Sequence, residues 1–80
     1  MMIWFGRNIT ELRRRNKMSR RELSEMIGYH ENEVYLWEKD QVEPGMSAII
    51  SIAGTFRVRV DELLLKDLCR KGAEKKGIIR

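Results

Sequence analysis

Hydrophobic residues recur along this chain at every third or fourth position, which is the period of an amphipathic α-helix. Glycine, proline and helix-capping residues separate the runs, so the sequence predicts an all-α fold of five helices. Four of the expected helices span residues 5–16, 20–27, 31–39 and 46–56. The fifth begins near Asp61. The apolar faces of the last two helices are expected to carry Met46, Ile49, Ile52, Ala53 and Phe56, then Leu63, Leu64 and Leu68.

The second and third helices are expected to be joined by a tight turn. Ser19 and Glu22 have the spacing of a capping box, in which each side chain binds a free backbone amide at a helix start. Gly28 is expected to end that helix, because glycine adopts the left-handed cap conformation at little cost. Val34 and Trp37 lie three residues apart, and we expect them to be buried on the inner side of the next helix.

Two short helices that cross through such a turn leave the outer face of the second free to enter a DNA major groove. The sequence thus predicts a helix-turn-helix unit over residues 20–39. The chain also contains the stretches ITELRRRNKMSRRELSEMIG, VYLWEKD and ISIAGTFRVRVDELL, with Pro44 before the last of them. In these stretches, residues 5–64 resemble the phage-repressor and Cro type of helix-turn-helix domain, the XRE family. The resemblance implies a compact five-helix lambda-repressor-like domain with helix 31–39 as its recognition helix.

The length of 80 residues supports one domain with a modest core. We assign residues 1–70 to that helix-turn-helix domain. Residues 71–80 contain two glycines and scattered charge, and we expect them to form a flexible basic tail.

No nucleophile motif, phosphate loop or metal-ligand spacing occurs in the sequence, so we expect no enzymatic activity, cofactor or metal site. The apolar stretches are too short to cross a bilayer, and the amino terminus lacks the features of an export signal. We therefore expect a cytoplasmic protein that does not bind a membrane. A single cysteine, Cys69, agrees with a reducing compartment.

The net charge of +4 permits a nucleic-acid partner, but the charge is unevenly distributed. Residues 1–28 carry seven basic and three acidic groups, residues 29–50 carry one and five, and residues 51–80 carry eight and four. Four residues of the acidic segment would face a negatively charged DNA backbone: Glu31, Glu33, Asp40 and Glu43. Two functions therefore stay open.

The first is a sequence-specific DNA-binding transcription regulator, a repressor by its resemblance, with helix 31–39 in the major groove. The second is a protein-interaction module, such as an antitoxin or regulatory subunit, whose acidic helix binds a protein partner. For the DNA-binding function, the candidate base contacts are His30, Glu31, Asn32, Tyr35 and Leu36. Asn32 is the best single candidate, because its amide can form two hydrogen bonds with adenine.

Candidate phosphate contacts come from basic residues in the first three helices and the turns between them. They are Arg14, Lys17, Arg20, Arg21 and Lys39. The resemblance places Arg20 where the family often has a phosphate-binding glutamine. It also implies a structural pair between Arg13 and Glu38, which would hold the fold and read no bases. Arg57 stands where the family usually has a glycine that caps the fourth helix, and a left-handed backbone there would cost about 1 kcal/mol.

A domain of this size makes few DNA contacts, so we expect a homodimer that binds an inverted repeat of double-stranded DNA. Two groups of apolar residues are candidates for the dimer interface: Met2, Ile3 and Trp4 at one end, or Leu65 and Leu68 in the last helix. The same residues could instead cover the domain's own core.

Overall fold

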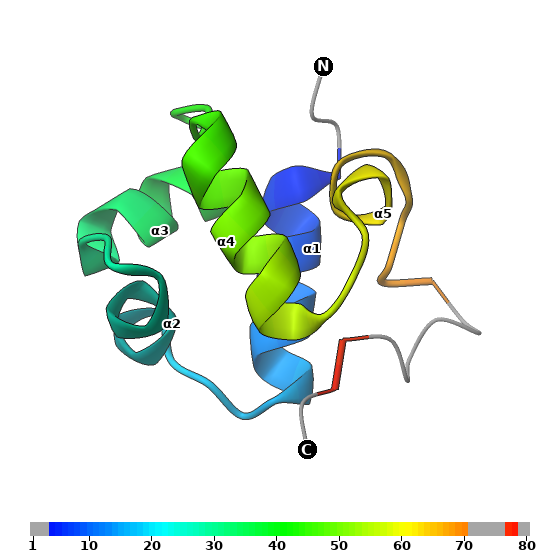
Figure 1. The fold of residues 1–80 in the computed structure, drawn as a ribbon, viewed down its shortest axis with the longest axis horizontal. Helices are drawn as coiled ribbons and strands as arrows, with labels where there is room; N and C mark the ends of the chain where they lie inside the picture. Colours follow the sequence, from blue (N-terminus) through cyan, green and yellow to red (C-terminus); the bar gives the residue numbers. More distant parts are fainter. Residues whose placement is uncertain (1–3, 71–76, 79–80) are drawn as a thin grey trace.

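The computed structural model describes residues 4–70, 77 and 78, and this part of the chain forms five α-helices. They are α1 (Phe5–Arg15), α2 (Arg20–Ile27), α3 (Glu31–Glu38), α4 (Met46–Phe56) and α5 (Val60–Leu65) (Figure 1). The first four agree with the predicted helices to within one residue. The fifth starts at Val60 and ends before Leu68, which the pattern places on the helix. In the described part of the chain, no helix is long and apolar enough to cross a membrane.

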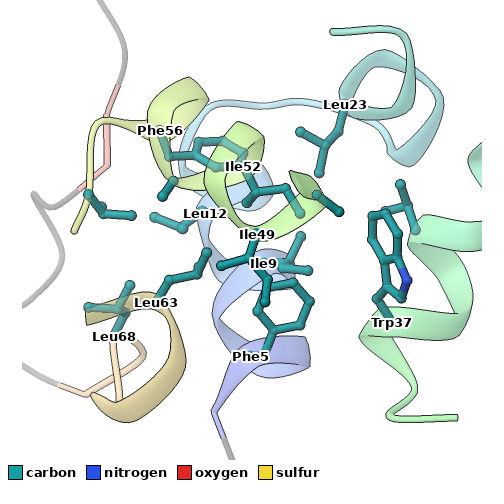
Figure 2. Packing of buried hydrophobic residues seen from close by; sticks show 14 residues of the cluster. Phe5, Ile9, Leu12, Leu23, Trp37, Ile49, Ile52, Phe56, Leu63 and Leu68 are labelled. Atoms are coloured by element: carbon teal, nitrogen blue, oxygen red, sulfur yellow. The ribbon is translucent and has the colours of Figure 1, made fainter. Parts of the chain in front are cut away.

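One hydrophobic core lies between α4 and the other helices, with side chains from all five helices (Figure 2). Its buried members are Phe5, Ile9, Leu12, Leu23, Val34, Trp37, Ala48, Ile49, Ile52, Ala53, Phe56, Val58, Leu63 and Leu68. The predicted burial of Val34 and Trp37 is confirmed, because they are 0% and 3% exposed. The predicted burial of Met46 is wrong, because this side chain is 63% exposed at the first turn of α4.

Leu68 belongs to the core rather than to a free surface. Although it follows α5, it is only 2% exposed, so it is not available as the dimer contact considered above. Leu65 is 63% exposed. Met2 and Ile3 lie outside the described residues, as do residues 71–76, 79 and 80 of the predicted flexible tail. Within that tail, the Gly77 carbonyl accepts a hydrogen bond from Asn16 Nδ2 at 2.8 Å.

Asn8 connects α1 to the end of α5. This fully buried side chain donates from Nδ2 to the carbonyls of Leu63 at 2.9 Å and Lys66 at 2.7 Å. Its Oδ1 accepts a hydrogen bond from the Leu68 backbone N–H at 3.0 Å. The last carbonyls of a helix have no hydrogen-bond partner within that helix. At the end of α5, the single side chain of Asn8 donates hydrogen bonds to two such carbonyls.

Gly6 allows α1 to lie against the end of α3. A Cβ atom on Gly6 would lie 2.7 Å from the Trp37 carbonyl oxygen and 2.8 Å from the Glu38 carbonyl oxygen. Both atoms belong to the backbone, so they have little freedom to give way. Glycine at this position therefore permits the close approach of α1 to the end of α3, the predicted recognition helix.

The backbone at the end of α4 is left-handed at Arg57, with φ 56° and ψ 40°. Arg57 therefore has the backbone conformation in which glycine is the favoured residue. We expect Arg57→Gly to raise the free energy of unfolding by up to about 1 kcal/mol, because glycine adopts this conformation without a Cβ clash. Urea unfolding followed by circular dichroism measures the change. Arg57→Ala is the control, since it removes the same long side chain and keeps Cβ; equal stability of the two variants would contradict the strain.

Candidate nucleic-acid interface

The turn between α2 and α3 is built by the two predicted local signals. Ser19 Oγ accepts from the Glu22 backbone N–H at 3.0 Å, and Glu22 Oε1 accepts from the Ser19 N–H at 2.8 Å, so the capping box is confirmed. Gly28 is left-handed with φ 79°, and its N–H donates to the Ser24 carbonyl at 2.9 Å. Ser24 is only 3% exposed, and its small side chain leaves room for the crossing helix.

The inner face of α3 is fixed by aromatic packing as well as by the core. The rings of Tyr29 and Trp37 meet edge to face, with 5.3 Å between their centroids and 67° between their planes. The Tyr29 hydroxyl also forms a 2.8 Å hydrogen bond with Ser47 Oγ at the start of α4. The turn before α3 is therefore held against both α3 and α4.

The opposite face of α3 is directed to solvent. The exposed residues on this helix and at its two ends are His30, Glu31, Asn32, Tyr35 and Lys39, and Leu36 beside them is half-buried. The helix thus brings the five predicted base contacts together on one side and at its N-cap. An amide, a phenol and an apolar side chain on one exposed helix are the groups that recognise base edges in a major groove.

Two of the five acidic residues of this segment, Glu33 and Glu38, are used inside the domain. Glu33 is half-buried, and its Oε1 accepts a hydrogen bond from the His30 backbone N–H at 3.1 Å. It caps α3 and does not lie on the outer face. Glu38 is also turned inward, with a side chain that is 1% exposed. On the outer face, the negative charge of Glu31 is accompanied by the positive charge of Lys39 at the end of the helix.

Glu38 fixes the end of α3 to both preceding helices. Its Oε2 lies 2.6 Å from Arg13 Nε, and its Oε1 lies 2.9 Å from Arg13 Nη2 and 2.8 Å from Arg20 Nε. Burial acts to raise the pKa of this carboxyl, but the hydrogen bonds and charges of Arg13 and Arg20 outweigh burial and lower the pKa. The structure contains the Arg13–Glu38 contact that the resemblance implies, and it adds a second arginine that the sequence did not indicate.

Arg20 also links this buried carboxylate to the outer face of α3. Its guanidinium carbon lies 4.9 Å from the centre of the Tyr35 ring, and Lys39 Nζ lies 5.8 Å from the same centre. Two cations near one aromatic ring restrict its position through cation–π attraction. The phosphate contact predicted for Arg20 stays a prediction, and the contacts observed for this residue are with Glu38 and Tyr35.

The family model for helix-turn-helix domains matches residues 9–63, which is more than half of the chain. The chain belongs to the helix-turn-helix family. This match and the structural likeness given next confirm the XRE-type resemblance and the five-helix repressor-like fold. Among solved structures, the nuclear magnetic resonance structure of the DNA-binding domain of the P22 C2 repressor is similar, with a TM-score of 0.75 and 23% sequence identity. The likeness covers 88% of this chain and 92% of that chain and concerns the fold. A search of curated proteins gave no match.

The remaining phosphate candidates of this helix-turn-helix domain lie in two places. Arg21, on α2, is exposed, and its Nε lies 3.3 Å from Glu25 Oε2. Arg14 pairs through Nε with Glu11 at 2.9 Å, and Lys17 is exposed in the turn after α1. The phosphate contacts predicted for Arg14, Lys17, Arg21 and Lys39 stay predictions.

Proposed function

We propose that this helix-turn-helix domain is a sequence-specific transcription regulator, a repressor, that places α3 in the major groove of DNA. The observation that carries the proposal is a recognition helix fixed on its inner side and open on its outer side. Trp37 anchors the inner side, and Glu38 anchors the end through two arginines. A helix held in this way binds without an ordering cost, which favours affinity. The fold likeness to a repressor's DNA-binding domain supports the repressor assignment.

Each outer residue suits a defined part of the DNA. We assign Asn32 to an adenine. Its Nδ2 can donate to adenine N7 while its Oδ1 accepts from the N6 amino group, and only adenine offers this pair of groups side by side. Leu36 offers an apolar contact for a thymine methyl group. Arg21 and Lys39 are assigned to phosphates, which position the protein and carry no sequence information. We further propose that a homodimer binds an inverted repeat, as the small size of one domain suggests.

The charge distribution favours DNA over a basic protein partner. The negative net charge of residues 29–50 suggests an acidic docking surface, but Glu33 and Glu38 are occupied by backbone and arginine contacts, and the exposed Asp40 and Glu43 lie in the loop after α3. The outer face of α3 keeps one acidic residue beside one lysine. A protein-only function would instead be indicated if the domain selects no DNA sequence in the experiment below.

We expect Asn32→Ala to relax the preference at one base pair by about 1–3 kcal/mol while leaving the salt dependence of binding unchanged, because a base contact carries no charge. Arg21→Ala should weaken binding to all sequences and lower the salt slope by about one unit. Selection from a random DNA pool at low salt, followed by titrations at several salt concentrations, measures both. Gln41→Ala is the matched control, since it removes an exposed amide outside α3. Failure to select any sequence would favour the protein-only function.

A further inference from the structure

The outer face of α4 carries exposed apolar side chains and no charge. Met46 and Ile50 are 63% and 56% exposed, and a Cβ on Gly54 would meet nothing within 4 Å. These three residues are four positions apart, so they form one ridge along the helix, which we call the α4 ridge. No residue of Met46–Phe56 is charged, whereas 35% of the chain is. Figure 1 shows α4 in front of the other helices, and none of them covers the side of α4 that faces the viewer.

The exposure of these side chains has no explanation within the domain. The buried residues of α4 fill the core, and Met46 and Ile50 are not among them. An uncharged helix in such a highly charged chain indicates a surface that is covered by another molecule. We propose that the α4 ridge packs against the α4 ridge of a second copy of the chain, with the two helices antiparallel about a twofold axis at Ile50.

The shape of the ridge suits this arrangement. An axis at Ile50 brings this residue against its own copy and places Met46 opposite Gly54 of the partner subunit. A long side chain thus faces a position that has none, at both ends of the contact. An isologous interface requires such self-complementarity, because the same patch supplies both sides.

Charge at the two ends of the ridge specifies the antiparallel orientation. Glu43 lies three residues before Met46, and Arg57 lies three residues after Gly54; both are exposed. Among the ion pairs between described residues, none includes either of them. An antiparallel pair brings Glu43 near Arg57 of the partner subunit twice, whereas a parallel pair would oppose like charges.

This proposal rests on the proposed function in one respect, since it supplies the dimer that an inverted repeat requires. The Tyr29–Ser47 hydrogen bond ties α4 to the turn before α3, so a contact through α4 orients both recognition helices. One helix face buries less than the roughly 1,200 Å² at the lower limit of stable complexes. Association is therefore weak in solution and is strengthened when two copies occupy one DNA molecule.

Disulfide cross-linking tests the position of the axis without DNA. In a Cys69→Ser background, we expect Ile50→Cys to form a covalent dimer under mild oxidation about tenfold faster than Leu65→Cys, because a residue on a twofold axis faces its own copy. Leu65 is the matched control, since it is an apolar residue of similar exposure on α5. Equal rates of cross-linking would overturn the proposal.

Charge exchange tests the orientation in the same Ile50→Cys and Cys69→Ser background. Glu43→Arg alone and Arg57→Glu alone should each slow cross-linking, and the two together should restore the rate. No restoration would overturn the antiparallel pairing. Binding of the wild-type chain to a single half-site is measured in parallel. If half-site binding persists while cross-linking is unselective, only the α4 interface fails; if no DNA site is bound, the proposed function fails whatever the cross-linking gives.

Discussion

Replacing Asn8 by leucine is expected to lower the free energy of unfolding by about 3 kcal/mol or more. Leucine has the same branched heavy-atom skeleton, but its methyl groups make no hydrogen bonds, and its larger volume adds strain at this buried position. The carbonyls of Leu63 and Lys66 and the N–H of Leu68 then stay without partners beside the core. Each buried polar group left in this state costs about 1–3 kcal/mol. Urea unfolding followed by far-ultraviolet circular dichroism measures the loss.

The same substitution at an exposed asparagine provides the control. Asn32 lies on the outer face of α3, and Asn32→Leu should change the unfolding free energy by less than about 0.5 kcal/mol. Asn8→Asp separates shape from hydrogen bonding, because a carboxylate keeps the shape but replaces the donor with an acceptor that faces carbonyl oxygens. Equal stabilities of the Asn8→Leu and Asn32→Leu variants would show that the α1–α5 connection contributes nothing.

The second large effect is expected at Glu38. Glu38→Gln should cost about 3 kcal/mol, because it leaves the guanidinium of Arg13, with a side chain that is 15% exposed, beside a neutral group. The control is Glu25→Gln, which breaks an exposed ion pair with Arg21 and should have little effect on stability. Thermal and urea unfolding of both variants at neutral pH give the comparison.

Acidification supplies an independent measurement of the same interaction. The folded protein lowers the pKa of Glu38 below its ordinary value of 4.5, so the folded state favours the ionised carboxyl. The stability that results is complete above the unfolded pKa and is lost as the pH falls through the folded pKa. We expect the unfolding free energy to decline below about pH 4.5, with a shallower decline in Glu38→Gln. Glu11 and Glu22 also have lowered pKa values and contribute to the remaining slope. An unchanged slope in Glu38→Gln would contradict the assignment.

The helix-turn-helix unit was predictable because its signals are local. The capping box at Ser19 and the left-handed Gly28 depend on residues within one or two helical turns, and the periodicity of α3 separates Trp37 from the outer face. Glu33 could also have been recognised as a cap from its spacing of three residues from His30. The exposure of Met46 was not predictable, since periodicity assigns a residue to a face but does not say how far the neighbouring helices extend.

The connections that hold the recognition helix depend on residues far apart in the chain. Arg20 and Glu38 are separated by 18 residues, and the partners of Asn8 lie at separations of 55, 58 and 60 residues. No local pattern encodes such contacts, because they exist only once the helices have packed. The Arg13–Glu38 pair was therefore predictable only from the family resemblance. The candidate base contacts, in contrast, were predictable from residue types and spacing.

The close approach at Gly6 has a consequence for how different DNA sites can be accommodated. Because α1 touches the backbone at the end of α3, a tilt of the recognition helix would carry α1 with it, and Asn8 would transmit the movement to α5. The domain is therefore expected to dock as one rigid body. Adjustment between operators must then come from bending and twisting of the DNA, and sequences that deform easily would be preferred even at base pairs that the protein does not touch.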